Sequence, residues 1–372
     1  MRQLRILGLY AMLNSYVFGA ESQQGSEKWV GFTEHQVEFN TDILSASDLT
    51  LSDGSIAYRA GNGHYEMGIS INHGYMDLDY RPNPVADLIG RSKDLSKNRI
   101  GGQLYFNIPI SKKIGWRLGA GFYDGYTNFR SLWLNEYYRQ QFSNLKGYQV
   151  AEPKGVNGLT GLRWEYLPAT GVAELNLSYQ VDQISPGYDR PLFQPLDRGR
   201  DRLKTGGLNI SIEQVITPKL RGRLQYGLTD TTIRSLRHAA QVSLNYSIAE
   251  SWVFRGSIAR TSEQDGFRSH SIEGMIEHDW SNRWFLGLGA RSYRDNGDIE
   301  NSLFVVSTAA PDLKSAQAFV SLKWTNEKTS FRIEAGPYFT DYAAPDSIVA
   351  PFAFLYSDRN FFRAGFSYTY SF

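Results

Sequence analysis

The sequence predicts an all-β protein that folds as a closed antiparallel transmembrane β-barrel of about eighteen strands, with sixteen as the alternative count. Three observations predict this class. Apolar and polar residues alternate along many short segments, tight turns separate these segments, and aromatic residues make up 14% of the 372 residues. Beyond the N-terminal segment, no apolar run reaches the ~20 residues that a membrane-spanning helix needs. A closed barrel pairs every backbone hydrogen-bonding group without such helices.

The clearest alternation lies in the last thirteen residues, 360–372. Every second position there is apolar or small: Phe362, Ala364, Phe366, Tyr368, Tyr370 and Phe372. This period of two is that of a β-strand. An exposed aromatic row would promote aggregation of a soluble edge strand, so the pattern predicts lipid on one face and water on the other. The alternative is a soluble all-β protein in which a second sheet buries the aromatic rings.

This closing segment resembles the last strand of the outer-membrane β-barrel proteins of Gram-negative bacteria, which typically ends on a phenylalanine with aromatic residues at alternate positions before it. The resemblance implies a porin-like barrel in the bacterial outer membrane, and it does not distinguish a subfamily. The implied partners are outer-membrane lipid, lipopolysaccharide and the outer-membrane insertion machinery, which would engage the C-terminal strand.

Residues 1–19 have the layout of a secretory signal peptide. Arg2 and Arg5 precede an apolar run over residues 6–18, and Val17 and Gly19 suit a cleavage site before Ala20. A membrane anchor is the alternative, but the run is too short to span a bilayer. We therefore expect an exported chain whose barrel occupies residues 20–372.

The rest of the chain consists of alternating segments joined by turns. In order, the expected strands are 29–39, 51–60, 64–78, 100–110, 116–129, 158–167, 172–184, 206–216, 220–228, 239–248, 252–261, 267–279, 284–293, 302–308, 316–325, 331–342, 348–356 and 361–372. Gly61, Asn62 and Gly63 form a strong hairpin turn between the second and third strands. The alternation is weak in 29–39 and 302–308, which is why sixteen strands remain the alternative.

The connections test the parity of this count. If the last strand runs down into the periplasm, successive connections alternate between the two sides of the membrane. The three longest early connections, 81–98, 130–157 and 185–204, then all fall on the outer side. The short turns fall on the periplasmic side: 61–63, 111–115, 168–171, 217–219, 249–251 and 280–283. A single miscounted strand would mix the two kinds of connection.

Aromatic residues at the strand ends beside the short turns predict a membrane girdle, where rings lie at the level of the lipid headgroups. The girdle candidates are Trp116, Tyr166, Tyr246, Trp252, Trp280, Trp284 and Phe372.

The polar face of each strand predicts the lining of the barrel. The charged candidates for the pore wall are Glu174, Asp182, Glu213, Arg221, Arg223, Lys323, Arg332, Glu334 and Arg363. Because both signs of charge occur in similar number, a pore lined in this way would be weakly ion-selective. The alternative is that the charges pair across strands and partly fill the bore.

Two of the long connections carry candidates for a constriction. Trp133, Tyr137 and Arg139 lie in the third outer connection, whose position resembles that of the inward-folding third loop of general porins, although the acidic loop motif of that family is not visible. Arg198, Arg200 and Arg202 lie in the fourth, where they would attract anionic solutes or bind lipopolysaccharide phosphates. The alternatives are a loop that lies over the barrel mouth and a solvated loop of mixed charge.

Composition excludes several functional classes. The chain has no cysteine, which excludes thiolate metal sites and disulfides, and its formal net charge of +1 offers no basic field for nucleic acid. The six histidines are scattered, and Ser269 and His270, as neighbours on one strand, would point to opposite faces. We therefore expect no enzyme, no cofactor, no metal and no nucleic-acid partner.

The sequence favours a channel for the passive diffusion of small hydrophilic solutes. One alternative is a structural or assembly barrel, or the outer-membrane component of an export system, with a filled lumen. A barrel-embedded hydrolase is the third. The sequence leaves the solute and the oligomeric state open.

Overall fold

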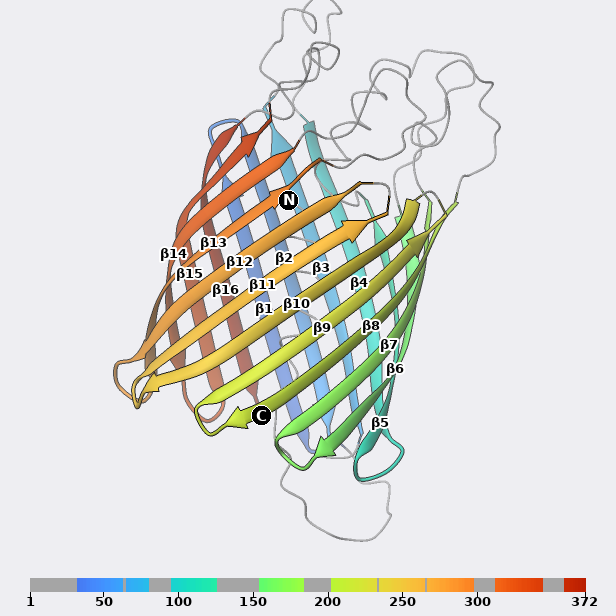
Figure 1. Ribbon diagram of the computed structural model, residues 1–372, viewed down its shortest axis with the longest axis vertical. Coiled ribbons are helices and arrows are strands. Elements are labelled where there is room, and N and C mark those ends of the chain that lie inside the picture. Colours follow the sequence, from blue (N-terminus) through green and yellow to red (C-terminus); the bar gives the residue numbers. More distant parts are fainter. Residues whose placement is uncertain are drawn as a thin grey trace, which may run out of the picture.

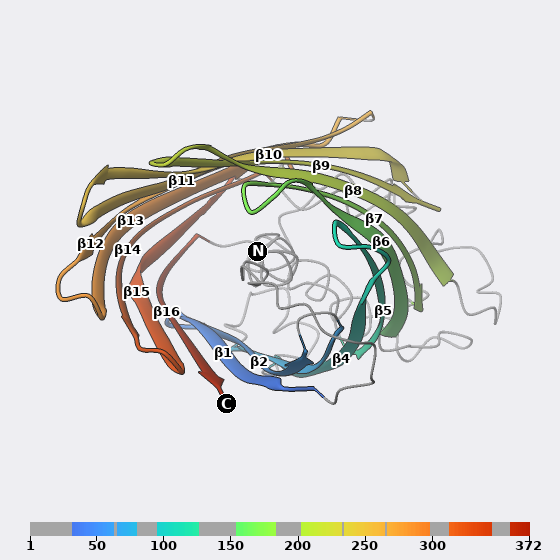
Figure 2. The ribbon, with the colours of Figure 1, turned by 90° about the horizontal axis from the view of Figure 1, so that it is seen from below.

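The computed structural model describes residues 32–62, 65–79, 95–125, 154–183, 202–232, 234–264, 266–297, 312–343 and 358–372. These residues form one closed barrel of sixteen antiparallel strands (Figure 1). Viewed along the barrel, the strands make a single ring that is wider in one direction than in the other (Figure 2). No helix among the described residues is long and apolar enough to span a membrane. The expected signal peptide lies outside the described residues.

Each strand follows its predecessor around the ring. The strands are β1 (Glu34–Ser45), β2 (Leu49–Gly61), β3 (Glu66–Leu78), β4 (Leu95–Pro109), β5 (Ile114–Asp124), β6 (Lys154–Leu167), β7 (Gly171–Gln183), β8 (Arg202–Thr217), β9 (Leu220–Thr231), β10 (Arg234–Ala249), β11 (Trp252–Glu263), β12 (Arg268–Asp279), β13 (Trp284–Asp295), β14 (Leu313–Thr325), β15 (Thr329–Tyr342) and β16 (Arg359–Ser371).

The last strand closes the ring by pairing with the first. The register of β16 against β1 runs without a break from the pair Gln36 and Ser371 to the pair Ser45 and Phe362. Closure leaves no strand with unpaired backbone groups at an edge, which is the condition for a sheet to stand in hydrocarbon. The alternation of 360–372 therefore belongs to a strand that is paired on both sides.

The ring has the sixteen strands of the alternative count. β13 pairs directly with β14, and β15 pairs directly with β16, so no further strand stands between them. The expected strands 302–308 and 348–356 lie outside the described residues. A short alternating run satisfies the local pattern of a strand, but only its pairing register decides whether it belongs to the ring.

The first strand also differs from its expected range of 29–39. β1 begins at Glu34 and continues to Ser45, six residues beyond the expected end at Phe39. This extension follows from pairing, because residues 40–45 bond to both β16 and β2. The consecutive polar residues Asn40, Thr41 and Asp42 interrupt the alternation that predicts a strand.

All the long connections lie at one end of the barrel, together with the short connections 46–48, 232–233 and 264–267, and the other end has short turns alone. The turns between residues 110 and 114, 167 and 171, 217 and 220, 249 and 252, 279 and 284, and 325 and 329 lie at the same end as Phe372. We call this the turn end. The strands that flank 81–98, 130–157 and 185–204 all open at the other end, here called the loop end, as the parity argument predicts.

Candidate functional site: the inner wall

Successive side chains on each strand face opposite sides of the barrel wall. On β7, Leu175 and Tyr179 are 40% and 51% exposed, whereas Asn176 and Asp182 are 8% and 4% exposed. The polar set lies on the concave face, because its side chains reach over a neighbouring strand to contact the strand after it. Tyr123 of β5, for example, donates a short hydrogen bond to Asp182 of β7. The concave face of the ring is therefore a polar wall.

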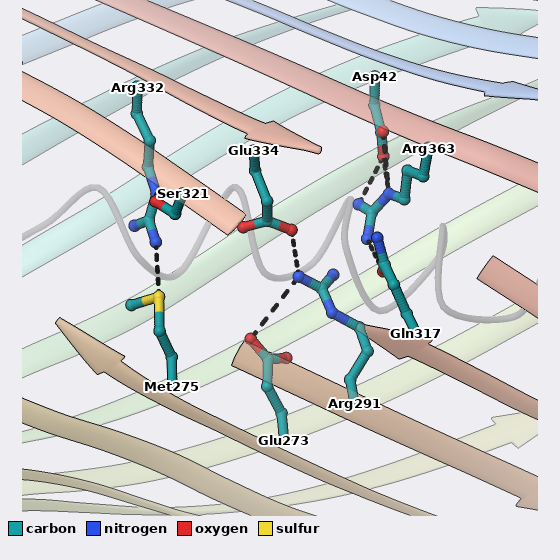
Figure 3. A network of polar contacts seen from close by, with 9 residues as sticks. All are labelled: Asp42, Glu273, Met275, Arg291, Gln317, Ser321, Arg332, Glu334 and Arg363. Atoms are coloured by element: carbon teal, nitrogen blue, oxygen red, sulfur yellow. Dashed lines mark hydrogen bonds and ion pairs between the residues drawn. The ribbon is translucent and has the colours of Figure 1, made fainter. Parts of the chain in front are cut away.

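The closing seam of this wall is held by two arginines of β16. Arg363 donates from Nε to Oδ1 of Asp42 at 2.9 Å and from Nη2 to Oδ2 at 2.6 Å (Figure 3). Its Nη1 donates to Oε1 of Gln317 at 3.1 Å. Nearer the loop end, Arg359 makes a second two-point contact, with Asp48. Bidentate arginine–carboxylate pairs combine charge with fixed geometry, so these contacts set the register of closure.

A second arginine of the wall lies between two acids. The guanidinium of Arg291 on β13 contacts Glu334 of β15, reaching past β14, and lies 3.9 Å from Glu273 of β12 (Figure 3). Its plane also covers the ring of Phe319, with 4.5 Å between the guanidinium carbon and the ring centroid. One cation is thus held between carboxylates from both sides of its own strand.

Nearer the turn end, two cations face each other without a carboxylate partner. Lys323 of β14 and Arg332 of β15 are register partners. Arg332 donates from Nε to the Ser321 hydroxyl at 2.9 Å and from Nη2 to the Met275 sulfur at 3.1 Å (Figure 3). The ammonium of Lys323 lies 5.2 Å from the Phe285 ring centroid. Neither cation forms an ion pair with any described carboxylate, so this part of the wall carries excess positive charge.

On the part of the wall formed by β3 to β7, acidic side chains accept most of the contacts. Glu66 of β3 accepts hydrogen bonds from the Tyr105 hydroxyl at 2.8 Å and from the Asn107 amide at 3.0 Å. Arg117 of β5 donates to Oδ1 of Asn107 at 3.0 Å and lies 3.5 Å from Glu174 of β7. The described ion pairs join strands no more than two places apart. They therefore run along the wall and do not cross the bore.

All nine residues expected to line the pore occupy inward positions, but the structure does not gather them into one site. They are spread from β7 to β16. Glu213 pairs with Arg221, Glu174 with Arg117, and Glu334 with Arg291.

Several inward charges were not among the candidates. Asp42, Arg117 and Arg291 belong to the same period-two pattern, which was sufficient to place them on the wall. Their partners come from the register of distant strands, which the pattern does not contain.

Most of the loop candidates cannot be placed. Trp133, Tyr137, Arg139, Arg198 and Arg200 lie outside the described residues. Arg202 is the first residue of β8, and its backbone is paired with that of Gln183.

The girdle candidates lie at strand ends or turns of the turn end. Trp116, Tyr246, Trp252, Trp280, Trp284 and Phe372 are between 37% and 71% exposed, and Tyr166 is partly buried. Trp324 and Phe331 extend this group, although the sequence did not single them out. The register pairs Trp284 with Trp324 and Trp324 with Phe331, and the Trp284 and Phe331 rings meet edge to face with centroids 5.7 Å apart.

No protein-family model and no curated protein matches this sequence. Solved structures do match in fold. CdiB from Acinetobacter baumannii aligns with a TM-score of 0.51 and 12% identity, over 91% of this chain and 60% of CdiB. A bacterial polysaccharide outer-membrane secretin aligns with a TM-score of 0.51 and 8% identity, over 91% of this chain and 98% of the secretin.

The chain has the fold of a bacterial outer-membrane β-barrel. The alignment with this chain covers less than two thirds of the length of CdiB and nearly all of the length of the secretin. At these identities the likeness concerns the fold alone.

Acidic and histidine side chains are scattered over the described part of the barrel. No group of three His, Asp or Glu side chains there is placed to hold a metal ion. Ser269 is 7% exposed and His270 is exposed, so they face opposite sides of β12. His238 contacts the Tyr226 hydroxyl and His73 contacts the Asn98 amide oxygen. None of the histidines within the described ranges hydrogen-bonds a carboxylate.

Proposed function

We propose that this outer-membrane barrel is an aqueous channel for the passive diffusion of small hydrophilic solutes. The observation that carries the proposal is the polar inner wall of a sixteen-stranded ring. Barrels of sixteen to eighteen strands are wide enough to hold an aqueous channel. The charges of this wall bond to their neighbours along the wall, which leaves the axis of the ring free of described side-chain bridges.

The pairing of charges bears on selectivity. Most inward arginines have an acid within ion-pair distance, including Arg59 with Glu38 at 3.1 Å and Arg255 with Glu277 at 2.9 Å. Paired charges present little net field to a passing ion. We therefore propose weak ion selectivity, with a small preference for anions near Lys323 and Arg332.

Single-channel recording of the purified protein in a planar bilayer tests this function. Discrete, stable conductance steps are expected. The matched preparation is the heat-denatured protein at the same concentration, which removes detergent artefacts. Silence from protein that is shown to be folded by its heat-modifiable electrophoretic mobility would rule out the channel.

A specific observation favours a second candidate, a barrel with a filled lumen. Near the loop end, the inward side chains of Leu49, Leu51 and Met76 are 1%, 2% and 0% exposed. Apolar side chains that face inward and are fully buried indicate dense packing at this level of the wall. A barrel closed in this way would be a structural barrel or part of an export system, for which the fold likeness to a polysaccharide outer-membrane secretin is the analogy. Absence of conductance in folded protein would favour this candidate.

We do not propose a barrel-embedded hydrolase. Such an enzyme needs a nucleophile and a base within hydrogen-bond reach of each other. In the described part of the wall, the inward hydroxyl groups contact carboxylate, arginine, glutamine and backbone groups, and none of them contacts a histidine.

A further inference from the structure

Four basic side chains lie side by side across the outer face of β11–β14, near the loop end. The register pairs Arg260 with His270, His270 with Arg294, and Arg294 with Lys314. All four are exposed. Arg268, also exposed, lies two residues from His270 on the same face of β12. We call these five residues the basic row.

The basic row borders the apolar band of the barrel. The next outward residues toward the turn end include Ile258 and Ile272, which are 61% and 54% exposed. On β13, Arg294 is ten residues beyond Trp284 in the chain. Ten residues of a strand tilted by ~40° rise about 25 Å, which is the height of the apolar band of outer-membrane barrels. The basic row and the Trp284 girdle thus lie at the two boundaries of this band.

The cations of the basic row are largely without protein counter-ions. Within the described ranges, Arg260, Arg268 and Arg294 form no ion pair. Lys314 lies 3.6 Å from Asp341, and both side chains are more than half exposed, so water screens this contact. Asp312, two residues before Lys314, is a second exposed acid at this margin among the described residues. The centre of the row therefore presents donors that no acid among the described residues satisfies.

We propose that the basic row binds the phosphate groups of a lipid of the outer leaflet, of the lipopolysaccharide type. Guanidinium groups match phosphate oxygens with two parallel hydrogen bonds, and they do so best where apolar surroundings weaken competition from water. The row crosses three inter-strand spacings of ~4.8 Å, or about 14 Å. This length favours a headgroup that carries two phosphates over a single small anion, while the acyl chains lie on the adjoining apolar band.

The rest of the described rim lacks this arrangement. On the far side of the ring, Asp124 is the register partner of Lys154, and Asp230 lies near Lys204 on the paired strands β8 and β9. Mixed charges of this kind satisfy one another. The proposed site is therefore local to β11–β14, and it does not depend on whether the barrel conducts.

Native mass spectrometry of the full-length protein in detergent tests the site. The probes are diphosphorylated lipid A, dephosphorylated lipid A and inorganic phosphate. The test variant combines Arg260→Gln, Arg294→Gln and Lys314→Gln. Loss of three charge-assisted contacts is expected to weaken binding of the diphosphorylated lipid by about tenfold or more. The dephosphorylated lipid is expected to bind both proteins weakly and equally.

The matched control combines Lys154→Gln and Lys204→Gln, which removes cations from the other side of the rim. It is expected to bind the diphosphorylated lipid as the wild type does. Equal losses of lipid binding in both variants would mean that only the overall charge of the rim matters, and would overturn the proposed site. Unchanged binding by the test variant, or displacement of the lipid by inorganic phosphate at similar concentration, would also overturn it. Heat-modifiable mobility of each variant verifies that it is folded.

Discussion

Arg363 of the last strand holds Asp42 of the first strand in a two-point contact, with Nη2 2.6 Å from Oδ2 and Nε 2.9 Å from Oδ1. The two residues are 321 positions apart in the chain, and their side chains are only 10% and 20% exposed. The pair therefore links the first strand to the last strand, where the ring closes.

Asp42→Asn is expected to lower the free energy of unfolding by about 2–3 kcal/mol, because it leaves the Arg363 guanidinium largely buried without its counter-ion. Urea unfolding of the barrel in lipid vesicles, followed by tryptophan fluorescence, measures the change. Asp341→Asn is the control, since it removes a well-exposed partner of Lys314 and should change stability by less than about 1 kcal/mol. Equal effects of the two substitutions would contradict the role of the seam.

Glu334→Gln is expected to shift the channel toward anions. The substitution removes the main carboxylate partner of Arg291 and adds one net positive charge to the wall. A unit charge about 10 Å from an ion in water changes the energy of the ion by about 0.4 kcal/mol, or a factor of about two in permeability ratio. The reversal potential in a salt gradient reports this ratio. Glu250→Gln, in an exposed turn, should leave the ratio unchanged.

Lys323→Gln is expected to act in the opposite direction. It removes one of the two facing cations that form no ion pair with a described acid, so the permeability ratio should move toward cations by about the same factor. The same recordings of reversal potential measure it. A shift toward anions, or no shift in a conducting channel, would show that Lys323 does not face the conducting path.

Leu288→Arg tests which face meets lipid. Leu288 is 67% exposed on the outer face of β13, in the middle of the apolar band. A cation at this depth costs about 2–4 kcal/mol in outer-membrane barrels. Vesicle-based unfolding gives the loss. The matched substitution Gln241→Arg, on the inner face of β10, should cost clearly less because polar groups surround it, and the reverse order would show that the faces are misassigned.

Trp284→Ala tests the girdle at the turn end. The rings of Trp284, Trp324 and Phe331 lie within 6.4 Å of one another, centroid to centroid. Removing the Trp284 ring should lower the free energy of unfolding by about 1–3 kcal/mol, through lost ring contacts and lost burial in the interface. Trp284→Phe should retain most of it. An alanine variant as stable as the wild type would place these rings outside the membrane interface.

The sequence predicted which residues share a face, and of its two strand counts, about eighteen and sixteen, the ring has the second. Glu174 and Lys323 stand on the wall where the period of two placed them. The alternative of paired charges was open from the sequence, and the structure shows pairs such as Glu213 with Arg221. The sequence did not single out Trp324 as a girdle residue, and its register with Trp284 adds it to the group.

The sequence by itself determined the class of the protein, the alternation of faces along each strand and the ends at which the connections up to residue 283 lie. These follow from the alternation of side chains along a strand, which is a local property of the backbone. Only the tertiary structure decided that sixteen strands close the ring, that Arg291 reaches Glu334 across β14, and that four basic residues align on the outer face. Each of these depends on the register between strands, and register is set by hydrogen bonds between segments far apart in the chain.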